Sequence, residues 1–208
     1  MRLGILGPAL GDLPALARGA QHLMDSAQAD KVLYVGNDDA LDRVVASWAR
    51  GIVGANPSDA ALFDRAAERC AHGTAEDIDE FVAKERALRR LRVLMSVPPG
   101  QRTIEILDRY VLLFVYDKAT LDTEDIGAAH VLVFGRSDEP IIKRVGSRTF
   151  VTPGPITSDG GGLLLLEDAS GGLHIEVRGS SGNVVASDTH VIGTGGAKLK
   201  VQGSGRDG

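Results

Sequence analysis

The sequence predicts an α/β fold, and three observations support this prediction. Two short apolar runs near the N-terminus each end at glycine and are each followed by a helical pattern. The middle of the chain is helical and highly charged. The second half consists of short apolar runs that glycine-rich turns separate. Strands that alternate with helices favour a parallel sheet with right-handed crossovers.

Length and composition narrow the class of protein. The 208 residues suit a single domain, with 43% hydrophobic and 25% charged residues. No apolar run approaches the roughly 20 residues of a membrane span, and the first residues lack the pattern of a signal peptide, so we expect a cytoplasmic protein without membrane contact. The net charge of -5 argues against nucleic-acid binding. One cysteine and five histidines argue against a disulfide and against a metal centre rich in Cys or His.

The first quarter of the chain predicts two strand–helix pairs. Residues 2–7 are apolar on both faces, which is typical of a buried strand, and Gly-Pro ends the run. A helical stripe follows from Asp12, which can cap it, to Met24. Residues 31–35 predict a second strand, and residues 38–53 predict a second helix.

The middle of the chain predicts a helical insertion over about residues 57–95. One helix runs to Cys70, which we expect as a small buried residue. Thr74 and Asp77 have the spacing of a capping box at the start of a second helix. That helix carries a dense run of charge over residues 81–92. We interpret the run as a solvated face; the alternative is a docking surface for an acidic partner.

The second half predicts mainly strands. Asp108 and Gly146 mark the turns of two hairpins, and a short acidic helix is expected at residues 121–126. The composition shifts to Gly, Ser and Lys over residues 193–208, which predicts a flexible tail. The predicted strands are 103–107, 110–115, 130–134, 141–145, 149–151, 163–167, 173–178 and 184–192.

Several motifs resemble the calcineurin-like metallophosphoesterases of the small bacterial phosphodiesterase type. MRLGILGPALGDLPAL at residues 1–16 resembles their opening, in which a strand ends in Ser-Asp-x-His-Gly before a helix. VLYVGN at 32–37 resembles their second strand with its Gly-Asp motif, and VLVFGRSD at 131–138 stands where they have Gly-His-Thr-His. FVTPGPI at 150–156 resembles their Asn-Pro-Gly-Ser segment. The resemblance covers about residues 1–56 and 100–190. It implies one domain over residues 1–192, a two-sheet β-sandwich flanked by helices.

The same resemblance argues against the reaction of this family. Its chemistry needs two metal ions held by Asp, His and Asn, and Mn²⁺ or Mg²⁺ would be the cofactor. Most of the corresponding side chains here cannot bind a cation. They are Pro8 and Leu10 in the first motif, Asn37 in place of the bridging Asp, Val115 or Tyr116 after a central strand, and Arg136 and Asp138 in the last motif. The resemblance therefore implies no catalytic residues and no metal cofactor.

Polar residues at the predicted strand ends leave two interpretations open. Oxygen ligands from Asn37, Asp38, Asp39, Asp117 and Asp138 could form a rebuilt Mg²⁺ or Ca²⁺ site, although capping of a helix explains the pair at 38 and 39 more simply. The preferred hypothesis is a salt-bridged cluster that fills the former metal site. The candidate residues of this vestigial pocket are Asn37, Asp38, Asp117, Lys118, Arg136 and Asp138.

These expectations favour a catalytically inactive metallophosphoesterase-like protein that binds a protein partner as a scaffold or regulatory module. One alternative is a metal-dependent phosphodiesterase or phosphatase with a rebuilt site. Another is an anion or nucleotide sensor in which Lys118 and Arg136 hold the ligand.

Overall fold

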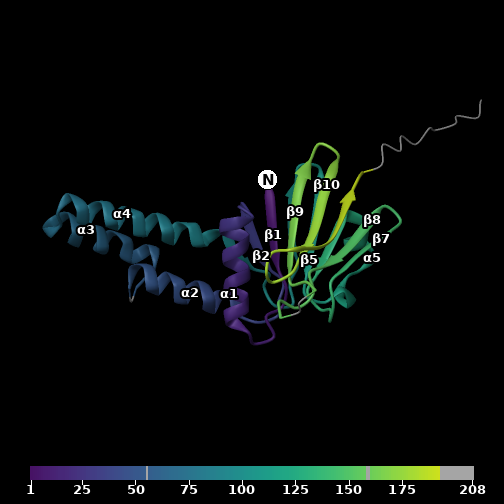
Figure 1. Cartoon of the computed structure of the whole chain (residues 1–208), viewed down its shortest axis with the longest axis horizontal. Coiled ribbons are helices and arrows are strands. Elements are labelled where there is room, and N and C mark those ends of the chain that lie inside the picture. Colours follow the sequence, from purple (N-terminus) through teal and green to yellow (C-terminus); the bar gives the residue numbers. More distant parts are fainter. Residues whose placement is uncertain (55, 158–159, 193–208) are drawn as a thin grey trace, which may run out of the picture.

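The computed structural model describes residues 1–54, 56–157 and 160–192, which form a two-sheet sandwich with a helical arm on one side (Figure 1). The order of the first sheet is β11 (Val184–His190), β10 (Gly172–Arg178), β9 (Leu163–Ala169), β1 (Arg2–Leu6), β2 (Lys31–Tyr34) and β3 (Leu94–Ser96). This sheet contains the buried run predicted at the N-terminus as β1; β1, β2 and β3 are parallel, and the other strands are antiparallel.

The second sheet has parallel strands in its centre and a hairpin at each edge. The hairpin turns lie where the sequence predicts them, at Asp108 with φ of 53° and at Gly146 with φ of 60°. Its order is β4 (Thr103–Leu107), β5 (Tyr110–Val115), β6 (Val131–Phe134), β8 (Arg148–Thr152) and β7 (Ile141–Val145). The α/β class and the two-sheet architecture are thus confirmed.

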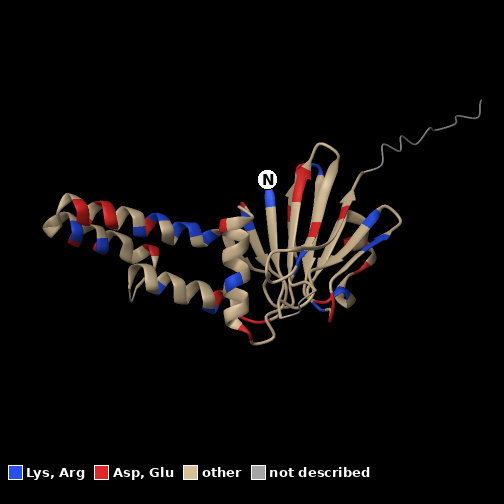
Figure 2. Cartoon of the chain, viewed as in Figure 1, with Lys and Arg blue, Asp and Glu red and all other residues tan. Residues whose placement is uncertain are grey.

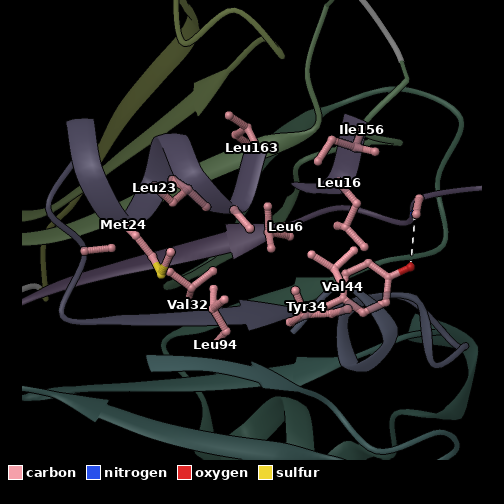
Figure 3. Close-up of a cluster of buried hydrophobic side chains, with 14 of the residues drawn as sticks. Leu6, Leu16, Leu23, Met24, Val32, Tyr34, Val44, Leu94, Ile156 and Leu163 are labelled. Carbon is pink, nitrogen blue, oxygen red and sulfur yellow. Dashed lines mark hydrogen bonds between the residues drawn. The ribbon is translucent and has the colours of Figure 1, made fainter. Parts of the chain in front are cut away.

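Strand β1 shows why the sandwich is stable. Its side chains alternate between two cores, as successive side chains of a strand must. Leu3 and Ile5 point into the core between the two sheets, where Phe114 and Val133 from the opposite sheet are also fully buried. Leu6 points the other way, into a second core beneath the helices (Figure 3).

Helices cover the outer faces of both sheets. On the first sheet, α1 (Leu13–Gln21) continues as a π-helix over His22–Ser26, and α2 (Ala40–Val53) follows β2. Asp12 caps α1 by accepting the N–H of Ala15 at 2.9 Å, as predicted. The second sheet carries the short α5 (Thr123–Ala128), with a capping box formed by Asp122 and Asp125.

The helical arm consists of α3 (Leu62–His72) and α4 (Ala75–Arg90), which extend away from the sandwich beyond the end of α2 (Figure 1). The predicted capping box starts α4, because the Thr74 hydroxyl accepts the Asp77 N–H and the Asp77 carboxylate accepts the Thr74 N–H. No residue of α3 is buried, and Glu85 is the buried residue of α4. The arm therefore lacks a hydrophobic core of its own.

The structure corrects the sequence analysis at three points. Strand β3 begins at Leu94, inside the segment 57–95 predicted as helical; three residues are too few to show a strand period. Cys70 is exposed, because α3 has no neighbour on that side among the described residues. The third point concerns the short helix, which begins at Thr123 and not at Leu121.

Two further predictions concern the C-terminal tail and membrane-spanning segments. The predicted tail at residues 193–208 lies outside the described residues. Within the described part of the chain, the helices are too short or too polar to cross a bilayer.

Candidate functional site

The carboxyl ends of the central strands of both sheets meet at one edge of the sandwich. A Cβ atom added to Gly135, after β6, would lie 1.8 Å from the carbonyl oxygen of Val35, after β2. A Cβ atom added to Gly7, after β1, would lie 1.8 Å from the carbonyl oxygen of Gly154, after β8. The two sheets therefore approach each other here through bare backbone, which explains why glycine ends these strands.

The loop after β1 is held by a buried tyrosine. The hydroxyl of Tyr34 accepts the N–H of Ala9 at 3.1 Å (Figure 3) and donates to the Asp38 carboxylate at 2.7 Å. Burial, together with the Asp38 carboxylate, raises the pKa of the Tyr34 phenol well above its ordinary value, so the hydroxyl stays protonated and can donate. This side chain ties the loop after β1 to the start of α2.

The two residues that stand in place of metal ligands in this loop differ in exposure. Pro8 is buried, whereas Leu10 is 68% exposed. Leu10 adopts φ of 49°, a left-handed conformation that is uncommon for residues other than glycine. An apolar side chain is therefore presented to solvent at the position where the resemblance implied a histidine ligand.

The acidic residues after β2 mainly serve the helix that follows. Asp38 accepts the N–H of Ala40 at 3.1 Å in addition to the Tyr34 hydroxyl, so this carboxylate is engaged at the start of α2. Asp39 occupies the N-cap position without a side-chain capping bond. Asn37 is exposed beside them. The Asp38 carboxylate thus binds a backbone N–H at the start of α2, as the capping interpretation predicted. The Asp39 side chain makes no such bond.

The charged residues after β5 and β6 form an ion pair across the strand ends. Arg136 donates to the Asp117 carboxylate at 2.5 Å, and the N–H of Ala119 donates to the same residue at 2.9 Å. These two donors, the N–H of Ala119 first, hold the pKa of the Asp117 carboxyl below its usual range. The negative charge of Asp117 is thus fixed and already balanced by Arg136.

The other two members of the predicted charge cluster lie differently. The Lys118 ammonium lies 4.8 Å from the centre of the Phe134 ring, in a cation–π contact. Asp138 is exposed, and its charge adds to the effect of Asp117 in raising the pKa of Arg136. The structure therefore brings Asp117 and Arg136 together, with Asp138 nearby, while Lys118 packs on an aromatic ring.

The side chains at this edge do not fit the two-metal centre that the resemblance implies. The side chains of proline and leucine have no atom that can bind a metal ion. The carboxylate of Asp117 is already bound by the guanidinium cation of Arg136. Across the residues that the structure describes, no three His, Cys, Asp or Glu side chains are grouped so that they could hold a metal ion.

A cavity beside this edge was not predicted from the sequence. Asp42 accepts the Ser96 hydroxyl at 3.0 Å on its wall, and Met95 is 45% exposed there. Sequence reasoning missed this cavity because it missed β3, which brings the following Pro-Pro turn next to α2. The lining residues are Asp38, Asp39, Asp42, Met95, Ser96, Pro98 and Pro99.

Two mixed sheets that meet at the ends of their parallel strands, with helices on the outer faces, define the calcineurin-like metallophosphoesterase fold. No protein-family model matches the sequence, and no curated protein matches it in sequence. Solved structures do match. YfcE, a phosphoesterase from E. coli, superimposes with a TM-score of 0.56 at 14% identity over 92% of this chain and 100% of its own.

Two further structures support the same architecture. A protein described as a predicted phosphoesterase from Streptococcus pneumoniae gives a TM-score of 0.51 at 11% identity, covering 90% of this chain and 97% of its own. An archaeal phosphodiesterase gives 0.50 at 13% identity, covering 85% and 99%. At these identities the likeness shows the fold alone.

Proposed function

We propose that this protein is a catalytically inactive metallophosphoesterase-like protein that binds a protein partner as a scaffold or regulatory module. The observation that carries the proposal is the helical arm. It comprises 27 helical residues, 11 in α3 and 16 in α4, and Glu85 is the buried residue among them. Helices in globular proteins gain most of their stability from packing an apolar face. An arm without a core is therefore suited to packing against another protein.

Apolar side chains on the arm supply the contacts that a partner would bury. Phe63 on α3 is 79% exposed, the highest exposure among the large hydrophobic residues of the described chain. Ile78 on α4 is 37% exposed. Aromatic residues that become buried often dominate the affinity of an interface. Phe63 is thus our candidate for the anchor residue.

The strand-end edge supports the inactive half of the proposal. Three of the positions that correspond to metal ligands hold Pro8, Leu10 and Arg136, whose side chains cannot ligate a metal ion, and Arg136 is paired with Asp117. The candidate pocket residues are assigned no catalytic role. The same proposal includes a cytoplasmic location. It also includes that the protein has no metal cofactor and binds neither nucleic acid nor a membrane.

The alternative of an anion or nucleotide sensor is less well supported by the contacts. Arg136 is neutralised by Asp117, and the Lys118 ammonium lies over the Phe134 ring, so neither cation is poised toward a ligand. This alternative, and that of a rebuilt hydrolase, serve as outcomes of the tests below.

The partner is tested with a photo-crosslinking amino acid placed at Phe63. The proposal expects one cross-linked protein in extracts of the native host, and expects the purified pair to bind at least about 30-fold more weakly after Phe63→Glu. The same crosslinker at Ile104, which is 62% exposed on the sandwich, is the matched control. Equal, unselective cross-linking at both positions would contradict the proposal.

Inactivity is tested with bis-p-nitrophenyl phosphate in the presence of Mn²⁺ or Mg²⁺. The proposal expects no hydrolysis above the buffer rate and no Mn²⁺ binding at micromolar concentrations in calorimetry. Metal-dependent hydrolysis that is lost in Asp138→Ala would establish the rebuilt hydrolase instead. Thermal stabilisation by a nucleotide that disappears in Arg136→Ala would establish the sensor.

A further inference from the structure

The charges of α4 are separated along its length. Acidic residues occupy its first two turns, toward the tip of the arm, and basic residues occupy its last two turns, toward the sandwich (Figure 2). This order complements the helix dipole and thus favours the isolated helix too. Which of these charges are paired within the chain, and where the others lie around the helix, indicates what the helix can bind.

Several of these charges already have partners within the chain. Asp77 closes the capping box, Glu80 pairs with Lys84 at 2.6 Å, and Arg90 pairs with Asp25 at 2.8 Å. Glu85 pairs with Arg65 at 2.8 Å. Apart from Asp77 of the capping box, four α4 charges have no oppositely charged group within 4.0 Å in the part of the chain that the structure describes. They are Glu76, Asp79, Arg86 and Arg89.

These four charges share one side of the helix. With 100° of rotation per residue, the four charges span an arc of about 140°. Glu76, Asp79 and Arg86 fall on the side opposite the less exposed Phe81 and Leu88, and Arg89 lies at the border of that side, next to Glu85. Small apolar residues lie among the charges, so that a second helix could approach closely. We call this surface the α4 outer face: Ala75, Glu76, Asp79, Val82, Ala83, Arg86 and Arg89, all of them exposed.

The α4 outer face is complementary to itself when reversed. Asp79 and Arg86 are equally far from the point between Val82 and Ala83, and so are Glu76 and Arg89. In an antiparallel pair of α4 helices related by a two-fold axis at that point, Asp79 of each copy faces Arg86 of the other at the centre, while Glu76 and Arg89 lie on opposite flanks of the interface. Val82 and Ala83 would then pack at the centre.

We propose that the α4 outer face binds the α4 helix of a second copy of this chain in antiparallel orientation. This proposal rests on the proposed function only in taking the arm to be a protein-binding element. One helix face buries less area than a standard interface, so a dimer with a dissociation constant on the order of 10 μM is expected. The two-fold arrangement would place the two sandwiches at opposite ends of the paired arms.

The test is a charge exchange between two variants, with the molar mass in solution measured by analytical ultracentrifugation. One variant carries Glu76→Lys with Asp79→Lys, and the other carries Arg86→Glu with Arg89→Glu. Each alone brings like charges together in the two central contacts and is expected to dimerise at least about 50-fold more weakly than the wild type. An equimolar mixture restores opposite charges at both central contacts, between positions 79 and 86, and is expected to form a heterodimer.

The control keeps the composition of α4 and leaves its outer face intact. Glu80→Lys with Lys84→Glu exchanges a pair that is already made within the helix, and this variant is expected to dimerise like the wild type. The mixture also controls for folding, since variants that had merely lost the helix would not pair. A wild-type chain that stays monomeric to about 500 μM, or a mixture that stays monomeric while the wild type dimerises, overturns the proposal. Neither result alters the test at Phe63, which concerns a different protein.

Discussion

The core between the sheets and the helical arm differ in how completely the chain buries their side chains. Between the sheets, residues such as Phe114 and Val133 are fully buried and packed from both sides. On the arm, the buried residue is a glutamate held by Arg65. The sandwich is therefore stable through its own contacts, whereas the arm depends on helix caps, ion pairs and whatever it packs against.

The largest expected difference between the two regions concerns their phenylalanines. Phe114→Ala removes a ring that is 0% exposed in the core and is expected to cost about 3–5 kcal/mol of unfolding free energy. Phe63→Ala removes an exposed ring and is expected to change that free energy by less than about 0.5 kcal/mol. Urea titrations of the two variants measure both values. Similar losses in the two variants would mean that the arm already has a core.

A second test concerns the backbone contact at the strand ends. Gly135→Ala places a Cβ atom against the Val35 carbonyl oxygen and is expected to destabilise the protein by about 3 kcal/mol. Gly51→Ala is the matched control, because nothing lies within 4 Å of that Cβ position in α2. The control is expected to gain about 0.5–1 kcal/mol from better helix propensity. Thermal unfolding distinguishes the two signs.

Weakening the ion pair between α3 and α4 tests whether the arm unfolds independently of the sandwich. Glu85→Gln leaves Arg65 without its carboxylate and is expected to cost about 1–2 kcal/mol within α3 and α4. Hydrogen exchange should accelerate over residues 62–90 while the strands of the sandwich keep their protection. Faster exchange throughout the chain would show that the two regions unfold together.

The smallest expected effect depends on pH. His190 is 2% exposed and lies 2.8 Å from the Thr149 hydroxyl, and burial, with help from Arg144, lowers its pKa below the ordinary value. The folded state then binds fewer protons than the unfolded state, so stability is complete above about pH 6.5 and falls as the pH drops below it. The slope is at most about 1.4 kcal/mol per pH unit for one group.

Urea titrations at several pH values measure this slope. His190→Gln should reduce this slope, and His72→Gln, on the exposed surface of the arm, serves as the matched substitution of a histidine. An unchanged slope in His190→Gln would assign the loss of stability at low pH to other groups.

The sequence predicted the sandwich better than its functional edge, for a physical reason. Buried strands such as Leu112–Val115 and capped helices such as the one after Thr74 leave a periodic or local signal. Strand β3 is too short to leave one, so the cavity next to Asp42 was missed. Of the predicted charge cluster, Asp117 forms an ion pair with Arg136, whereas Lys118 lies over the Phe134 ring. Side-chain contacts between distant segments depend on three-dimensional packing that spacing does not encode.

The place where the arm leaves the sandwich has an evolutionary consequence. Val45 and Ala49 of α2 share one small cavity with Leu88 and Leu91, so the outgoing and returning segments meet at the first sheet. An excursion with neighbouring ends can lengthen, shorten or be exchanged with little effect on the entropy of closing the loop. Related chains with this sandwich could therefore carry quite different arms, each fitted to its own partner, while the sheets stay the same.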